Sequence, residues 1–143
     1  MSHEERGTWI YLVTCTAAYA VYLAIVITRL TTAPAADVSY VPALLWTTGA
    51  SVMASTLGRT FAGTVTTGGD RRRDVRDLEI YRFGEYTSRW FVVAGAAAAL
   101  FMAMAKWDYF WIANVIYLGF VLWAVVGSGV KLAAYRRGLQ VPG

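Results

Sequence analysis

The sequence predicts an all-α integral membrane protein, folded as a four-helix bundle. Two observations predict this class. Of the 143 residues, 57% are hydrophobic and only 15% are charged, whereas soluble domains carry about 25% charged residues. Charged residues are also absent from four long runs, 7–28, 38–58, 90–105 and 109–130. Three runs reach the ~20 residues with which a helix crosses a bilayer, and the run at 90–105 is slightly shorter. This pattern excludes a soluble enzyme, a disulfide scaffold and a disordered chain.

The first two spans are expected at about residues 8–30 and 40–61. Trp9 and Tyr11 open the first span with amphipathic rings that favour the membrane–water interface, and Arg29 closes it. This segment is too long for the apolar region of a signal peptide and follows an acidic start, so we interpret it as a retained span. Pro42 falls in the first turn of the second span, where its missing N–H costs nothing.

Residues 62–89 form a cytosolic connection that becomes helical. The TVTTGG stretch at 64–69 is a linker, and Asp70 can cap the helix that follows. That helix has no Pro and has opposite charges three or four residues apart, which stabilise helices: Arg73 with Asp77, Glu79 with Arg82, and Glu85 with Arg89.

The third span, at about 88–105, is too short to cross alone, so we expect the cytosolic helix to run directly into it. A helix over residues 72–105 would be about 51 Å long, against ~30 Å for the hydrocarbon core. Gly84 is its expected bend, since glycine weakens helix interiors. The turn Lys106-Trp107-Asp108 then leads into a fourth span at about 109–131, which makes an antiparallel hairpin.

The basic residues set the orientation. With both termini inside, the inner side holds Arg6, seven arginines from Arg59 to Arg89, and three basic residues from Lys131 to Arg137, which is eleven of the 13 Lys and Arg. Arg29 and Lys106 remain outside. Cytoplasmic loops carry the excess of positive charge, which is known as the positive-inside rule. This rule predicts that both termini lie in the cytoplasm. The net charge of +4 therefore reports topology and not nucleic-acid binding.

Small residues recur at helical spacing and indicate where helices pack. Membrane helices associate by close approach of small side chains, because lipid is as apolar as leucine. The stripes either pack the bundle within one chain or form a dimer face. Their members in the second and third spans are Ala50, Ala54, Gly58, Gly95, Ala99 and Ala103.

The residue inventory favours a non-enzymatic protein with no cofactor and no metal. Cys15 is the only cysteine and His3 the only histidine. There is no nucleophile–base pair, CxxC, HExxH or phosphate loop. The spans hold no ionisable residue, which argues against proton-driven transport. Tyr19 and Tyr22 favour aromatic packing, and Asn114, near the outer end of the fourth span, favours an interhelical hydrogen bond.

The cytosolic stretch RRRDVRDLEIYRFGEYTSRW carries the most distinctive motif, D-x-R-D-x-x-I-x-x-x-G from Asp74 to Gly84. It resembles the family of small four-span prokaryotic membrane proteins known as domain of unknown function 2178, whose members have a D-E-R-D-x-x-I stretch between spans two and three. Val75 stands where Glu is common in that family. The resemblance implies the fold and the topology, and no activity. Alanine-rich, arginine-rich usage also favours a bacterium with GC-rich DNA.

These features lead to a hypothesis of function through contacts. The chain would be a subunit, regulator or sensor in the bacterial cytoplasmic membrane, and would bind its own copy, another membrane protein or anionic lipid. The expected partner surface is Asp74, Arg76, Asp77, Glu79 and Arg82, which would otherwise be a solvated helix face. The residues expected at lipid head groups are Arg71, Arg72, Arg73, Arg89, Arg136 and Arg137. The alternatives are a small oligomeric transporter or channel and, less favoured, an enzyme acting on lipid.

Overall fold

The computed structural model describes residues 3–63 and 71–137, and these residues form four long helices and no strand. The helices are α1 (His3–Leu30), α2 (Val41–Gly63), α3 (Arg71–Met104) and α4 (Tyr109–Arg137). A short 3-10 helix, η1 (Ala35–Asp37), lies between α1 and α2. The expected linker at 64–69 and the expected cap Asp70 lie outside the described residues.

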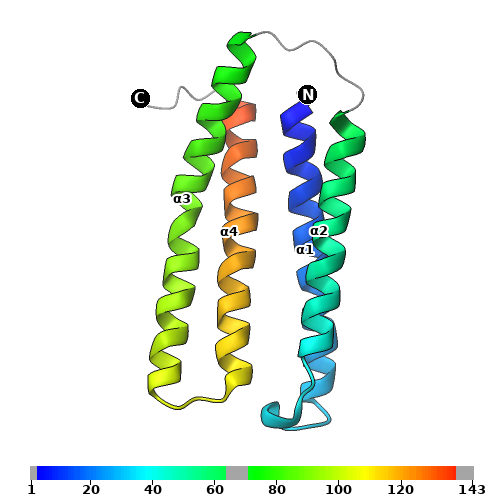
Figure 1. Cartoon of the computed structure of the whole chain (residues 1–143), viewed down its shortest axis with the longest axis vertical. Helices are drawn as coiled ribbons and strands as arrows, with labels where there is room; N and C mark the ends of the chain where they lie inside the picture. Colours follow the sequence, from blue (N-terminus) through cyan, green and yellow to red (C-terminus); the bar gives the residue numbers. More distant parts are fainter. Residues whose placement is uncertain (1–2, 64–70, 138–143) are drawn as a thin grey trace.

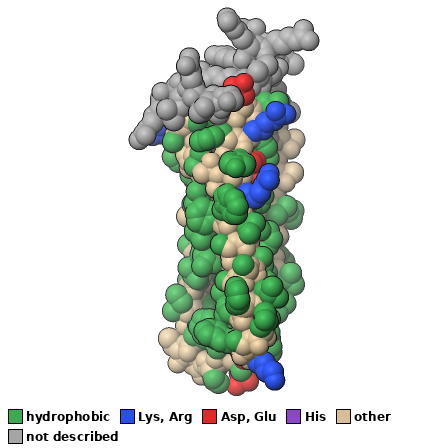
Figure 2. All heavy atoms as spheres, turned by 90° about the vertical axis from the view of Figure 1, so that its left-hand side faces the viewer, with side chains coloured by type: hydrophobic (Ala, Val, Ile, Leu, Met, Phe, Trp, Pro, Cys, Tyr) green, Lys and Arg blue, Asp and Glu red, His purple; other side chains and the backbone are tan. Residues whose placement is uncertain are grey.

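The four helices run antiparallel in chain order (Figure 1). We call the end where α1 begins and α4 finishes the terminus end. The opposite end, which holds the α1–α2 and α3–α4 connections, is the hairpin end. Among the described residues, three helices are long and apolar enough to cross a membrane, over Glu5–Leu30, Leu78–Met104 and Tyr109–Arg136. In the face shown in Figure 2, hydrophobic side chains cover the middle and charged side chains lie toward the two ends.

The order of the helices in space is α3, α4, α1, α2, which differs from a closed four-helix bundle. Extensive contacts join α3 to α4, α4 to α1 and α1 to α2 within the described residues, while α2 and α3 have no extensive contact. Water closes a soluble bundle because every helix must bury its apolar stripe. Lipid exerts no such force, so an open row is stable where neighbouring pairs pack closely.

α3 is one unbroken helix of 34 residues, as the sequence predicts for the charged segment and the third span. The helix is continuous through Gly84, the residue at which the sequence predicts a bend, and Gly84 is used for packing against α4. A Cβ at Gly84 would lie 2.6 Å from Cγ of Lys131 and 3.1 Å from the carbonyl oxygen of Gly127. The missing side chain therefore serves the approach of α3 to α4.

Small residues bring the backbones of α3 and α4 together along the hairpin. A Cβ at Gly95 would lie 3.1 Å from Cα of Gly119, and a Cβ at Gly119 would lie 3.2 Å from the carbonyl oxygen of Phe91. Ser88 is fully buried, and its hydroxyl donates to the carbonyl of Gly84 at 2.7 Å. The helices are thus packed backbone to backbone, which is how membrane helices gain contact energy.

Local capping explains the tight turn between α3 and α4. The N–H of Trp107 donates to Met102 O at 2.9 Å and the N–H of Lys106 donates to Ala103 O at 3.1 Å, which is the Schellman pattern of helix ends. Asp108 then caps α4, since its Oδ1 accepts from the N–H of Phe110 at 2.9 Å. Lys106 has φ of 57°, the left-handed conformation that favours glycine.

Glycine at position 106 should therefore stabilise the hairpin. We expect Lys106→Gly to raise the free energy of unfolding by about 1 kcal/mol, since it removes the steric cost of the left-handed conformation. Unfolding by SDS in mixed micelles measures this. Ala103→Gly, inside the last turn of α3, is the matched control and should lower stability by about 1 kcal/mol. A loss of stability in both variants would show that the conformation of Lys106 is not strained.

Packing at the hairpin end fixes the α1–α2 connection. Buried side chains from both helices, from the connection and from α4 form one cluster, which consists of Tyr22, Val26, Val38, Ala43 and Phe110. The guanidinium of Arg29 donates to the carbonyl of Ser39 across the connection. Tyr40 and Phe110 meet edge to face with ring centroids 5.3 Å apart. This end joins the α1–α2 pair to the α3–α4 pair.

Candidate functional site

The residues expected to bind a partner lie at the N-terminal end of α3, at the terminus end of the molecule. Glu79 and Arg82 are exposed. The backbone at Asp74, Arg76 and Asp77 is helical, and their side chains lie outside the described part of the structure. Helical geometry alone places these five positions along about two and a half turns of one helix.

Of the residues expected at lipid head groups, Arg136 lies at the terminus end, whereas Arg89 lies midway along α3. Arg89 and Arg136 are exposed, and the guanidinium of Arg136 lies 5.5 Å from the ring centroid of Trp9. That distance is within the range of a cation–π contact. The side chains of Arg71, Arg72, Arg73 and Arg137 lie outside the described part of the structure.

The expected packing stripes divide into buried and exposed members. Gly95 and Ala99 face α4, and Gly58 faces α1, since a Cβ there would lie 2.7 Å from Cγ2 of Ile10. The remaining members, Ala50, Ala54 and Ala103, are exposed in the single chain. Half of the stripe residues therefore pack within the chain, and the other half are available for other contacts.

An ion pair between α3 and α4 is the feature that the sequence did not reveal. Nζ of Lys131 donates to Oε1 of Glu85 at 2.9 Å, and the side chains of Lys131 and Glu85 are only 12% and 28% exposed. The sequence pattern pairs Glu85 with Arg89 one turn away, and this expectation is wrong. Glu85 is directed to Lys131 on α4, and the side chain of Arg89 is exposed.

The ion pair is held by its immediate surroundings. Nζ of Lys131 lies 3.9 Å from the centroid of the Tyr81 ring, which adds a cation–π contact to the pair. Gly84 and Gly127 lie beside it and let the two helices approach closely enough for the side chains to meet. Glu85 and Lys131 lie in the halves of α3 and α4 that are nearer the terminus end.

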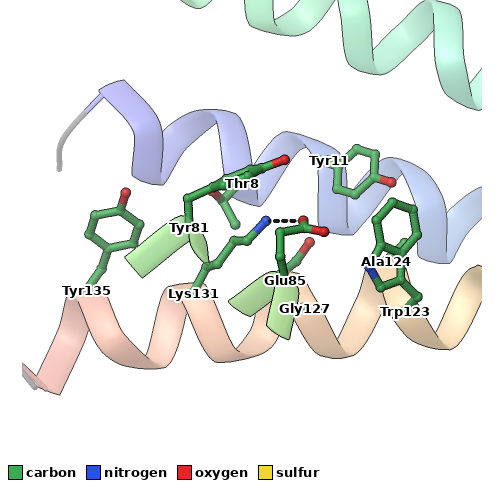
Figure 3. Close-up of a pocket in the computed structure, with 10 residues that line it drawn as sticks. Thr8, Tyr11, Tyr81, Glu85, Trp123, Ala124, Gly127, Lys131 and Tyr135 are labelled. Carbon is green, nitrogen blue, oxygen red and sulfur yellow. Dashed lines mark hydrogen bonds and ion pairs between the residues drawn. The ribbon is translucent and has the colours of Figure 1, made fainter. Parts of the chain in front are cut away.

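A polar cavity of about 280 Å³ surrounds the ion pair, between α1, α3 and α4 at the terminus end (Figure 3). Its lining residues are Thr8, Tyr11, Tyr81, Glu85, Trp123, Ala124, Gly127, Ser128, Lys131 and Tyr135. Ser128 is 3% exposed, and its hydroxyl adds a side-chain donor and acceptor to this lining.

A second cavity of about 140 Å³ adjoins the first and is mainly apolar. It lies between α1, α2 and α4, and shares Tyr11, Trp123 and Ala124 with the polar cavity. Two polar side chains reach it from α1 and α2, since Sγ of Cys15 lies 3.6 Å from Oγ of Ser51. The two cavities together offer one polar and one apolar compartment, which suits an amphipathic ligand.

A tyrosine and asparagine cluster lies toward the hairpin end. The hydroxyl of Tyr22 donates to Oδ1 of Asn114 at 2.8 Å, and Nδ2 of Asn114 donates to the carbonyl of Phe110 at 2.8 Å. Tyr22 and Tyr19 both pack edge to face on Tyr117, with centroids 4.9 and 5.5 Å apart. The expected interhelical hydrogen bond and aromatic packing are confirmed. The polar groups are paired, which makes this cluster structural.

The described side chains include no group of three or more His, Cys, Asp or Glu residues placed to hold a metal ion. The chemistry that the polar cavity offers is a cation, an anion and a hydroxyl beside aromatic rings, which is chemistry for binding. Comparisons with protein-family models, curated proteins and solved structures give no match to this chain. The class of the protein is defined by its fold: the described residues form helices, and three of these helices can cross a membrane.

Proposed function

We propose that the chain is a four-span, non-enzymatic protein of the bacterial cytoplasmic membrane that acts through contacts, as a subunit, regulator or sensor. Both termini and the charged part of α3 face the cytoplasm in this proposal. The eleven-to-two distribution of basic residues supports this orientation. The contact surface comprises Asp74, Arg76, Asp77, Glu79 and Arg82 on α3.

The length of α3 carries the proposal. Its 34 residues make a helix of about 51 Å, whereas a hydrocarbon core is about 30 Å thick. At the terminus end α3 extends beyond the ends of α1, α2 and α4 (Figure 1). The extending part is the charged part of the helix, and no other described helix packs beside its first turns. An ordered, charged helix that projects from a membrane domain is suited to docking on another molecule.

The proposal counts α2 as the fourth span. α2 has 23 residues, which is enough to cross, and contains several Ser and Thr residues that lower its hydropathy. The hydroxyls of Thr47, Thr56 and Thr60 donate to carbonyls four residues earlier, at 2.8, 2.8 and 2.9 Å. Such bonds satisfy the hydroxyl inside its own helix and reduce its cost in lipid.

Substitution of the acids on α3 tests the contact surface. We expect Asp74→Ala with Asp77→Ala to abolish co-purification of differently tagged copies, or of a stoichiometric partner, in mild detergent. Thermal stability should stay nearly unchanged, since exposed ion pairs contribute only ~0–1 kcal/mol. Asp37→Ala, an exposed acid at the hairpin end, is the matched control. If assembly survives the double substitution, these positions are only a solvated helix face.

An oligomeric transporter or channel is the second candidate, and the ion pair between α3 and α4 is the observation that favours it. Lys131 and Glu85 give the helices an ionisable pair in a cavity, which the sequence alone did not indicate. The exposed residues Ala50, Ala54 and Ala103 are available for packing between copies. A homodimer whose melting temperature rises with a transported substrate favours this candidate, and a stoichiometric partner protein favours the first.

A further inference from the structure

The polar cavity at the terminus end has an unusual balance of charge, because it contains one cation and one anion that neutralise each other. Lys131 and Glu85 are both largely buried and both line the cavity. A purely anionic ligand would meet the carboxylate of Glu85, and a purely cationic ligand would meet the ammonium of Lys131. A ligand that carries both charges can satisfy both side chains at once.

The donors around Lys131 suit a phosphate group. An ammonium has three hydrogens, and the structure assigns one of them to Oε1 of Glu85. Ser128, which is 3% exposed, lines the same cavity and can donate through its hydroxyl. Lysine and serine together can hold two phosphate oxygens, and bonds from an ammonium to phosphate are charge-assisted and strong.

The opposite charge of the ligand is matched by Glu85 and by aromatic rings. Oε1 of Glu85 accepts from Lys131, which leaves Oε2 for a second donor. The rings of Tyr11, Tyr81, Trp123 and Tyr135 line the cavity, and aromatic faces attract cations. A primary ammonium can donate to Oε2 and lie near these rings, whereas a quaternary ammonium has no hydrogen to donate.

The adjoining cavity supplies the place for an apolar chain. It continues from Tyr11, Trp123 and Ala124 toward the middle of the helices, where Val52 and Phe120 line it. The polar compartment lies toward the terminus end, where the head groups lie if the helices cross a bilayer, and the apolar compartment lies deeper. An amphipathic molecule in the two cavities would have its polar head toward the terminus end and its apolar chain deeper, which is the orientation of a membrane lipid.

We propose that these cavities form a specific site for a zwitterionic phospholipid whose head group joins a phosphodiester to a primary ammonium. Lys131 and Ser128 bind the phosphate, Glu85 binds the ammonium, and the start of one acyl chain enters the apolar compartment. The site is independent of the charged N-terminal part of α3 and goes beyond the function proposed for it. It differs from a general anionic-lipid surface, because Glu85 disfavours head groups that lack a cation.

Binding of defined lipids to the purified full chain tests the site. Native mass spectrometry of the delipidated protein in mild detergent compares phosphatidylethanolamine, phosphatidylcholine and phosphatidylglycerol of equal chain length. We expect phosphatidylethanolamine to bind at least tenfold more tightly than either of the others. Glycerophosphoethanolamine, the soluble head group without chains, should bind at least tenfold more weakly than the lipid.

Variants then assign the charges. Lys131→Gln should weaken binding of all three lipids at least tenfold, while Glu85→Gln should remove the preference for phosphatidylethanolamine over phosphatidylglycerol. The double variant Glu85→Gln with Lys131→Gln keeps a neutral hydrogen-bonded pair, so it preserves the fold and should lose the selective binding. Asp37→Asn and Lys106→Gln, both exposed at the hairpin end, are the controls and should bind as the unmodified chain does.

Several results would overturn the proposal. Equal binding of the three lipids, or no binding, would make Lys131 and Glu85 a structural clasp between α3 and α4. A preference for phosphatidylglycerol would make the cavity an anion site. Equal affinity for lipid and soluble head group would identify a small-molecule site instead of a lipid site. Unchanged selectivity in the double variant would place lipid binding elsewhere on the protein.

Discussion

Gly95→Leu should lower the free energy of unfolding by about 3 kcal/mol, the upper range for overpacking a well-packed site. Even the first atom of a new side chain meets backbone, since a Cβ at Gly95 would lie 3.1 Å from Cα of Gly119 and 3.4 Å from the carbonyl oxygen of Val115. Backbone cannot move aside as the tip of a flexible side chain can. The leucine must therefore separate α3 from α4, and SDS titration in mixed micelles should show the loss.

Ala97→Leu is the matched control, because Ala97 is exposed on the same helix two residues away. This variant also adds a leucine side chain and should change stability by less than about 0.5 kcal/mol, as surface substitutions usually do. Equal stability of the two variants would show that the backbones of α3 and α4 do not meet at Gly95 and Gly119.

Phe110→Ala should cost about 3 kcal/mol, the lower range for removing a buried phenylalanine. Phe110 is 1% exposed in the cluster that joins the two helix pairs, and its ring packs on Tyr40 and Trp111 with centroids 5.3 and 5.2 Å apart. In a membrane, the stabilisation that the substitution removes comes mainly from packing contacts and not from transfer out of water, since lipid is itself apolar. The loss of stability is therefore due to the cavity that the missing ring leaves.

Phe101→Ala removes the same atoms from a residue that is 71% exposed on α3, so it should leave stability nearly unchanged. The comparison separates packing from hydrophobicity, because both variants make the chain less apolar by the same amount. If both variants lose equal stability in mixed micelles, the cluster at the hairpin end does not hold the helix pairs together.

The helices themselves could be predicted from the sequence because their signals are local. Charge-free runs indicate the apolar stretches. The segment before the third span has no proline and has charges at helical spacing, which indicates that it continues as helix. Only three residues, 106–108, separate the third and fourth apolar runs, so these two runs must form a hairpin. Each of these signals lies within about twenty neighbouring residues.

The order of the helices and the ion pair could not be predicted, because both depend on which faces meet. Glu85 and Lys131 are 46 residues apart in the chain. Their encounter requires the rotation of α3 that Gly84, Ser88 and Gly127 permit. The sequence offered Arg89 as a nearer partner for Glu85, and local spacing cannot rank a neighbour on the same helix against one on another helix. The polar cavity was missed for the same reason.

The small-residue stripes show the same limit at single positions. Gly95 and Ala54 have the same kind of neighbours in sequence, yet Gly95 touches the backbone of α4 and Ala54 is exposed. Spacing identifies a face on which helices can approach closely. Which members of that face are used within the chain is decided by the partner helix, which has its own small residues at 119 and 127.

The central claim, a four-span protein with both termini and the charged part of α3 in the cytoplasm, is tested most directly by cysteine accessibility in intact cells. The experiment uses a Cys15→Ala background with single cysteines at Ser39, Trp107 and Thr67; Thr67 lies outside the described residues. Ser39 and Trp107 are exposed at the hairpin end. A membrane-impermeant maleimide should label positions 39 and 107 in intact cells, and position 67 only after permeabilisation. Labelling of position 67 in intact cells, with positions 39 and 107 protected, would contradict the orientation. Labelling of only one of positions 39 and 107 in intact cells would place them on opposite sides of the membrane and show that α2 does not cross it.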